Sequence, residues 1–432
     1  MSYRPLIIVL MLLYSVFAKA QDTLTVMQYN LLYYGNYNSG FAGCNEATNN
    51  TQEKDECIRT VLGYVKPDIL TVCELGARDY LQTDFLHHNL NTNGVTYWET
   101  DRIQYSSGSN ICNTIFFDSR KMGLKRHTTV DTSPRLTDVF ELYLKTQGLI
   151  HGDTIKLVCI VAHPKAGTDC EADRRVLIQK TMDYINQHYP TDNVLIMGDF
   201  NMYGASESGY RLMTQTYSNP DICFVDPVAY LGGVGAWNNN SQFTQFHTQS
   251  THSTSNDCFV SGGLDDRFDM ILMADEIAMN FNHLRYVQGS YKAVGNDGNH
   301  FNMSINQNYN AAVPAQVADA LFHASDHLPV TMKISVDAHL GISESNLPDL
   351  YASIAPNPAT NVATVFFNNP KAGQMRFLIH TLQGQVVLSK ETYCSEGEQQ
   401  LELQLGDLAK GFYLLRVENN HGVYETLKLM KQ

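Results

Sequence analysis

The sequence predicts a large α/β domain followed by a small all-β domain. From residue 22 to about residue 336, short runs rich in Val, Ile, Leu and Phe end in polar residues and alternate with a few helical stretches. Near residue 340 the pattern changes to a polar linker, beyond which only short β-like runs and turns remain. A chain of 432 residues is long enough for one large and one small domain.

The first twenty residues, 1–20, have the pattern of a signal peptide. Arg4 precedes an apolar run that is too short to span a bilayer, and Ala18 and Ala20 mark a cleavage site. We expect export and a mature chain that begins at Gln21, with an N-terminal membrane anchor as the alternative. No later segment approaches about 18 consecutive apolar residues, so we expect no transmembrane segment in the mature chain.

Seven strands are expected in the first domain, which we place at residues 21–340, and two helices, at 53–66 and 173–188. The strands are Leu24–Tyr29, Ile69–Cys73, Thr114–Phe117, Lys156–Val161, Val194–Met197, Asp269–Met273 and Pro329–Ile334. A long polar stretch at 232–263 is expected to be functional or mobile. A linker at 341–350 then leads to the second domain, at 351–432.

Charge and cysteine content narrow the class of protein. Without Arg4 and Lys19 the chain has 28 basic and 44 acidic side chains and a net charge of −16, which argues against broad electrostatic gripping of nucleic acid but allows a local basic groove. Export permits disulfides among the nine cysteines. Cys44 with Cys57, and Cys223 with Cys258, are candidate pairs because polar loop sequence separates them, although sequence alone leaves the connectivity open.

Six apolar runs are followed directly by side chains that bind metals or move protons. They are TVMQYN, PDILTVCE, CIVAHPKAG, NVLIMGDFN, RFDMIL and ASDHLPV. A single such strand end means little, because Asp and Asn are common in turns. Six of them can converge at one edge of a packed pair of sheets. The side chains they present are Asn30, Glu74, His163, Asp199, Asn201, Asp269, Asp326 and His327.

This set of side chains suits phosphodiester hydrolysis with a divalent cation. Carboxylate and amide oxygens bind hard cations, and histidines supply acid and base groups. The transition state carries charge on nonbridging oxygens, which a cation and amide donors neutralise. Neighbours on a strand point to opposite faces, so Asp326 and His327 both reach the site only if residues 325–328 form a turn.

In this order, PDILTVCE, IMGDFN, RFDMIL and SDHLPV resemble the endonuclease/exonuclease/phosphatase superfamily. The resemblance covers most of residues 22–336 and implies a four-layer α/β/β/α sandwich with Mg²⁺, Mn²⁺ or Ca²⁺ in its cleft. By position it makes Glu74 the main metal ligand, assisted by Asn30 and Asp326. It also favours pairing of Cys223 with Cys258.

The same resemblance implies the roles of five catalytic residues. Asp199 would position or deprotonate the attacking water, and Asn201 would hold the phosphate. His327 would be a general base or a phosphate contact, oriented by Asp269. His163 would be a phosphate contact or a general acid. An acidic partner for His163 is not evident in the motifs, and Glu99 and Asp101 are the candidates.

The C-terminal domain resembles the sorting domain of type IX secretion in Bacteroidetes. The resemblance rests on APNPATN, the Gln383-Gly384 turn, GDLAKGFYLLRV and the terminal TLKL. It implies the secretion machinery as a partner and a protein that is secreted or attached to the outer-membrane surface. An accessory binding sandwich is the alternative.

The chain is therefore expected to be a secreted, metal-dependent phosphodiester hydrolase, monomeric, and most simply a nuclease acting on extracellular DNA or RNA. The alternatives are a sphingomyelinase-like or other phosphoester hydrolase, and a non-catalytic surface binding module. Within the first domain, Trp98 is expected in the core and Trp237 is the better candidate for stacking on a base, while the loop histidines His247 and His252 are expected to be solvated.

Overall fold

The structure is a computed structural model that describes residues 22–36, 44–145, 154–215, 222–231, 235–255, 258–336, 350, 352–369, 371–381, 385–419 and 424–432. The chain divides into two compact units, on either side of residue 338. The expected signal peptide, nearly all of the expected linker and the Gln383-Gly384 turn lie outside the described residues.

The first unit contains two mixed β-sheets. One sheet has the strand order β11-β13-β1-β2-β4-β3, and β12 pairs with β13; the other has the order β5-β6-β7-β8-β10-β9. The pairs β1–β2 and β7–β8 are parallel, and the other neighbours are antiparallel. The strands of the first sheet are β1 (Asp22–Tyr34), β2 (Ile69–Gly76), β3 (Trp98–Thr100), β4 (Ile111–Asp118), β11 (Leu284–Tyr286), β12 (Lys292–Ala293) and β13 (Val330–Val336). Those of the second are β5 (Met122–Val130), β6 (Thr137–Leu144), β7 (Lys156–Ala162), β8 (Val194–Asp199), β9 (Phe224–Val225) and β10 (Asp269–Ala274).

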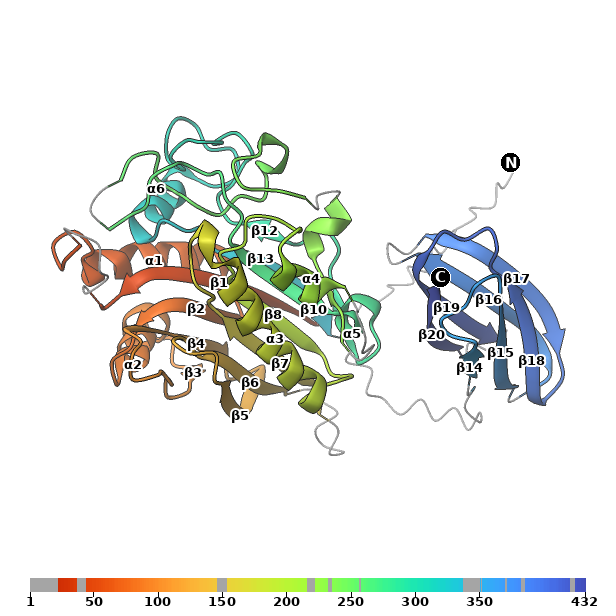
Figure 1. Ribbon diagram of the computed structural model, residues 1–432. Coiled ribbons are helices and arrows are strands. Elements are labelled where there is room, and N and C mark those ends of the chain that lie inside the picture. The colour runs from red at the N-terminus through yellow and green to blue at the C-terminus, as the bar shows by residue number, and fades with distance from the viewer. Residues whose placement is uncertain are drawn as a thin grey trace, which may run out of the picture. The chain divides into compact units, whose positions relative to one another are not determined.

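Helices cover the outer face of each sheet, as Figure 1 shows. Helices α1 (Thr51–Val65) and α6 (Ala315–Ala324) pack on the first sheet, and α3 (Glu171–His188) and α4 (Ser208–Thr214) on the second. The four-layer α/β/β/α sandwich expected from the sequence is therefore confirmed. The remaining helices of the described residues are short: α2 (Leu81–Phe85), a π-helix (Leu86–Leu90), α5 (Asp275–Met279) and three 3₁₀ turns (Thr168–Cys170, Pro227–Leu231, Ser241–Phe243).

Alternation along the strands divides each sheet between an outer and an inner core. In β8, Val194 and Ile196 pack against α3, while the intervening Leu195 and Met197 are buried on the opposite face, toward the other sheet. Burial on both faces explains why these strands read as continuous apolar runs rather than alternating ones. All seven expected strands and both expected helices occur, with ends that differ by a few residues.

Several expectations about individual residues were wrong. The disulfide joins Cys44 to Cys258, so neither Cys44–Cys57 nor Cys223–Cys258 forms. Trp98 is buried as expected, but Trp237 is buried too, and its Nε1 donates a hydrogen bond to the Met202 carbonyl at 2.6 Å. Trp237 therefore has no free ring face for a base.

The polar loop around residues 235–268 is packed rather than solvated in its described parts. His247 and His252 are both buried, contrary to expectation. His247 Nε2 lies 2.8 Å from the Trp237 carbonyl oxygen, and the His252 ring stacks on Phe322 with centroids 3.7 Å apart. Composition predicted exposure, but the carbonyls and rings that bury these histidines come from the tertiary fold.

The second unit is a small all-β sandwich, as expected. Its sheets have the orders β14-β15-β18 and β17-β16-β19-β20, and both contribute to one core. The strands are β14 (Ala352–Ala355), β15 (Val362–Asn369), β16 (Gly373–Thr381), β17 (Val386–Cys394), β18 (Gly397–Gln404), β19 (Gly411–Asn419) and β20 (Tyr424–Lys431). Among the described residues of both units, no helix is long and apolar enough to cross a membrane.

Gly198 provides a test of the β7–β8 packing. Its φ is +150°, and a Cβ there would lie 1.8 Å from the Ala162 carbonyl oxygen. We expect Gly198→Ala to lower the free energy of unfolding of the first unit by about 3 kcal/mol. As the control, Gly63→Ala in α1 meets no atom within 4 Å and should raise it by up to about 1 kcal/mol. Urea unfolding measures the free energy of unfolding of both variants. Equal values for Gly198→Ala and Gly63→Ala would contradict the close packing of β7 and β8.

Candidate active site

The eight predicted site residues meet at one edge of the two sheets. Because β1–β2 and β7–β8 are parallel, Asn30, Glu74 and Asp199 lie toward the carboxyl ends of their strands at the same edge. His163 directly follows β7, and Asp269 begins β10 as the cross-strand partner of Asp199. Asn201 follows β8, and the segment before β13 brings in Asp326 and His327. The strands and the segments next to them therefore gather side chains that are up to 297 residues apart in sequence.

Three of these residues form a compact group that can hold a metal ion. One ligand atom from each of Glu74, His163 and Asp199 lies within 4.8 Å of the others. His163 Nε2 is 3.7 Å from Glu74 Oε1 and 3.5 Å from Asp199 Oδ2. Asn30 Nδ2 donates to the same two carboxylate oxygens, at 3.1 and 3.0 Å. The amide of Asn30 thus holds the two carboxylates together.

Backbone irregularity aims Glu74 at the site. Its φ is +59°, and the pairing of β2 with β4 shifts register between Val72 and Leu75. On the neighbouring strand, Leu32 and Tyr33 also have positive φ, which turns the Tyr33 N–H toward Glu74 Oε2 at 3.2 Å. Non-glycine residues rarely hold this conformation, so the surrounding contacts must maintain it.

His327 and Asp269 form the closest histidine–carboxylate pair in the site. His327 Nδ1 lies 2.7 Å from Asp269 Oδ2, which leaves Nε2 directed toward Asp199 Oδ2 at 3.7 Å. Gln249 Nε2 lies 2.6 Å from the same His327 nitrogen. The carboxylate of Asp269 fixes the ring and keeps a proton on Nδ1, so Nε2 is the atom that gains or loses a proton at the cleft.

The Asp326 carboxylate is held on one side only. Its Oδ2 accepts a hydrogen bond from Val260 N–H at 3.0 Å, and its Oδ1 accepts none from the described residues. After α6, Ser325 is extended and Asp326 lies at a bend, so a bend rather than the expected turn over residues 325–328 brings both Asp326 and His327 to the site. One buried carboxylate oxygen is therefore available for a ligand.

Asn201 and His163 are tied to each other through the backbone. Asn201 has φ +51°, its N–H donates to Asp199 Oδ1 at 3.0 Å, and its Nδ2 donates to the Pro164 carbonyl at 3.2 Å. Arg135 Nη1 donates to the carbonyls of His163 and Pro164. These contacts fix the loop after β7 against the end of β8.

Burial and mutual repulsion set the protonation of the site. Burial, with the nearby Asp269 and Glu74, raises the pKa of Asp199 to about 7. Burial and the positive charge of Arg135 lower the pKa of His163 well below its usual value. Burial lowers the pKa of His327, but Asp269 and Asp199 outweigh it and raise that pKa well above its usual value. The pKa values of His163 and His327 are therefore shifted in opposite directions.

The donor set fits a hard divalent cation. Glu74, Asp199, Asp269 and Asp326 bring four carboxylates to one buried edge, and an oxygen of Asp326 and one of Asp269 accept no hydrogen bond from the described residues. Glu74, with Asn30, Asp326 or Asp199 beside it, would hold such an ion, whose charge would offset the repulsion. The compact geometric group includes His163 and Asp199, whereas the predicted metal set was Asn30, Glu74 and Asp326.

Sequence reasoning missed several residues that support the site. Thr248 Oγ1 accepts a hydrogen bond from Asp269 N–H at 3.1 Å, and Gln249 contacts His327. The buried Lys54 lies near the site as well. The proposed acidic partners of His163 were also wrong: Asp101 pairs instead with His127 at 3.0 Å, and Glu99 lies exposed on β3. Thr, Gln and Lys in loops or on helices have no sequence pattern that marks them.

Comparison with known proteins bears on both units. The family described as "Secretion system C-terminal sorting domain" matches residues 353–432. The second unit is a sorting domain. This sorting domain indicates secretion or attachment at the cell surface, in agreement with the resemblance seen in the sequence. No curated protein matches the chain.

Three solved structures resemble the first unit. TDP2 of D. rerio, complexed with a single-strand DNA product, is 14% identical over 73% of this chain and 100% of its own, with a TM-score of 0.46. An endonuclease/exonuclease/phosphatase family protein of Bacteroides thetaiotaomicron is 15% identical, over 73% and 99%, with a TM-score of 0.45. The human Nocturnin catalytic domain with bound sulfate is 14% identical, over 73% and 97%, with a TM-score of 0.42. Likeness this distant transfers no activity.

Replacing Asp269 tests the pair with His327. We expect Asp269→Asn to lower the pKa of the His327 ring, and NMR titration of the metal-free protein measures this pKa. A histidine whose pKa is raised by folding stabilises the folded state at pH values below its ordinary pKa of about 6.5. This stabilisation is lost as the pH rises through the pKa of the folded state. The variant should therefore lose most stability below that pH. Asp101→Asn, whose carboxylate faces His127, should leave His327 unchanged; equal titration of His327 in wild type and Asp269→Asn would refute the pairing.

Proposed function

We propose that the chain is a secreted, divalent-metal-dependent phosphodiesterase that acts on nucleic acid. The observation that carries the proposal is the convergence of Glu74, His163 and Asp199 beside the His327–Asp269 pair. A binding module without catalysis has no need for a histidine whose ring is oriented by a buried carboxylate. The sorting domain supports action outside the cell.

Each group has a role that its contacts support. A divalent cation, when bound, neutralises charge on the nonbridging oxygens of the phosphate. Asp199, between the two histidine rings, is placed to align the attacking water and accept its proton. His327 Nε2 faces the same space and exchanges a proton or contacts the phosphate, while Asp269 holds its ring. Asn201 and His163 bind the phosphate from the β7 side.

Nucleic acid is preferred to a lipid headgroup because of the residues beside His163. Tyr105 and Arg135 line the same hollow as His163, and Tyr105 is 37% exposed. An aromatic ring next to a guanidinium can stack on a base and hold the adjoining phosphate. In the described part of the first unit, the large exposed apolar side chains are scattered, and four of the six are tyrosines. Lipid-cleaving action would need an apolar surface that enters the membrane.

Hydrolysis assays test the proposal. Purified protein with Mg²⁺, Mn²⁺ or Ca²⁺ should cleave DNA or RNA, and EDTA should abolish the cleavage. Glu74→Gln and His327→Gln should each lower kcat by about 10²-fold or more, because both lose groups that act on charge or protons in the transition state. Glu99→Gln, exposed on β3, is the matched control and should keep full activity.

The outcomes separate the candidate functions. Cleavage of sphingomyelin without cleavage of nucleic acid would move the protein to lipid substrates. No turnover of DNA, RNA, sphingomyelin or bis-p-nitrophenyl phosphate with any of the three metals would reject the hydrolase.

Removal of the sorting domain tests the division of labour between the units. A chain ending at residue 338 keeps both cores of the first unit and the whole candidate site. We expect it to hydrolyse the same substrate with an unchanged kcat after purification. In the producing cells it should disappear from the surface and medium, measured by fractionation and immunoblotting. Normal export of the shortened chain would show that the sorting domain is dispensable.

A further inference from the structure

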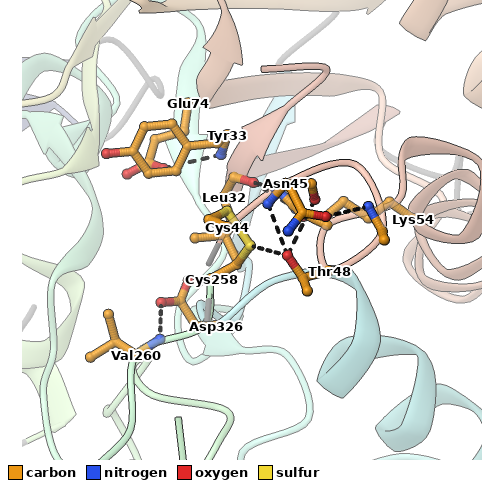
Figure 2. Close-up of a disulfide and its surroundings, with 12 residues drawn as sticks. Leu32, Tyr33, Cys44, Asn45, Thr48, Lys54, Glu74, Cys258, Val260 and Asp326 are labelled. Atoms are coloured by element: carbon orange, nitrogen blue, oxygen red, sulfur yellow. Dashed lines mark hydrogen bonds between the residues drawn. A yellow bond between two sulfur atoms is a disulfide. The ribbon is translucent and has the colours of Figure 1, made fainter. Parts of the chain in front are cut away.

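The Cys44–Cys258 disulfide lies between two hydrogen bonds that orient site carboxylates. It joins the segment before α1 to the loop before β10, across 214 residues of sequence. Figure 2 shows Glu74 with Tyr33 on one side of it and Asp326 with Val260 on the other. Among the described residues it is the one disulfide.

On the Glu74 side, the turn at Leu32–Tyr33 is held by the segment that contains Cys44 and by helix α1, which follows it. Lys54 Nζ donates to the carbonyls of Leu31 and Leu32, at 2.8 and 2.6 Å, and Asn49 Nδ2 donates to the Leu32 carbonyl at 3.0 Å. These contacts hold the left-handed turn whose Tyr33 N–H binds Glu74. The same turn carries Leu32 N–H to Asn30 Oδ1 at 2.9 Å.

On the Asp326 side, the contact comes two residues after Cys258. Val260 N–H donates to Asp326 Oδ2, and Ser250 Oγ binds the Val260 carbonyl. The Val260 side chain itself is 40% exposed, so its backbone rather than its packing serves the site. Without a tie nearby, an exposed loop residue would hold a carboxylate poorly.

The two sides meet at the disulfide. Leu32, Cys258 and Phe259 form one small buried cluster, against which Cys44 and Tyr33 pack. Thr48 Oγ1 lies 3.3 Å from Cys258 Sγ. The cluster contains few apolar side chains, so packing alone gives little force to keep the segments together.

We propose that the Cys44–Cys258 disulfide is a positioning strut for Glu74 and Asp326, so that the site reaches its metal-binding geometry only when both thiols are oxidised. The inference rests on the proposed function in taking these two carboxylates as metal ligands. Cys44, Cys258, Lys54 and Val260 act through Glu74 and Asp326 and touch neither metal nor substrate.

The disulfide would make the metal-binding geometry of the site depend on export. Oxidation removes two electrons and two protons from the Cys44 and Cys258 thiols and transfers them to a disulfide-bearing oxidant, which becomes a dithiol. Such oxidants act outside the reducing cytoplasm. An enzyme that cleaves phosphodiesters would then be held inactive until it has left the compartment that contains the cell's own substrates.

The test compares Cys44→Ser/Cys258→Ser with wild type and with Cys223→Ser, whose thiol is not disulfide-bonded. Cys223 directly precedes β9, which pairs with the end of β10 away from Asp269. Mn²⁺ affinity is measured by calorimetry, and amide exchange is followed at Tyr33 and Val260. We expect the double variant to lose Mn²⁺ affinity by about tenfold or more and protection at these two amides, with β7 and β8 unchanged. Cys223→Ser should match wild type.

Reduction of the native protein provides the second measurement, since the double variant depends on folding without the disulfide. A dithiol reagent is added to folded wild type, and released thiols, Mn²⁺ affinity and circular dichroism are followed together. Loss of affinity in step with thiol release, at constant secondary structure, supports the strut. Unchanged affinity and unchanged protection at Tyr33 and Val260 after complete reduction would overturn it.

The two proposals fail separately. Mn²⁺ binding that depends on the disulfide, in a protein that hydrolyses no phosphodiester, would keep the strut and remove the proposed function. Hydrolysis with the same kcat and Mn²⁺ affinity in oxidised and reduced protein would keep the function and remove the strut.

Discussion

Four buried carboxylates at one sheet edge are the constraint on which the rest of the first unit depends. Burial raises the pKa of Asp199 and of Asp326, and the charge of the nearby Glu74 adds to both shifts. Buried charge is tolerated only when it is hydrogen-bonded or neutralised. Asn30, Tyr33 N–H, Val260 N–H and His327 each satisfy part of this demand. These hydrogen bonds do not offset all of the negative charge, and the remaining charge attracts a cation. The charge repulsion that makes the site costly to fold therefore also makes it able to bind metal.

The architecture provides the rigidity that such a site needs. Strands buried on both faces carry Asn30, Glu74, Asp199 and Asp269, so the carboxylates stand on elements that cannot move independently. Irregular backbone occurs where side chains must be re-aimed, at Leu32, Glu74 and Asn201. Other non-glycine residues with positive φ lie away from the site, and at these three positions the surrounding hydrogen bonds maintain the unusual conformations.

Loops complete the site from outside the sheets. The polar stretch before β10 contributes Thr248 and Gln249 to the His327–Asp269 pair and Val260 to Asp326. Helix α1, which follows the segment that contains Cys44, contributes Lys54, whose pKa burial lowers to about 7 while the charges of Asp326 and Glu74 oppose that shift. These two segments are distant in sequence and adjacent in space, and the disulfide connects them. The sorting domain has a core of its own and indicates secretion or attachment at the cell surface.

The residues themselves predicted the strands and the eight polar residues at their ends, because burial on both faces of a sheet imposes apolar runs and chemistry places polar residues where the runs stop. The four-layer order was implied by the resemblance of the motifs to a known family. The motifs around Glu74, Asp199 and Asp326 are short runs of neighbouring residues, so they can be recognised in the sequence without knowledge of the fold. Only the tertiary structure decided that Cys44 pairs with Cys258, that His247 and Trp237 are buried, and that Lys54, Gln249 and Val260 support the carboxylates. Those contacts join residues far apart along the chain, and the free energy of such a contact depends on which segments the fold brings together rather than on any spacing between them.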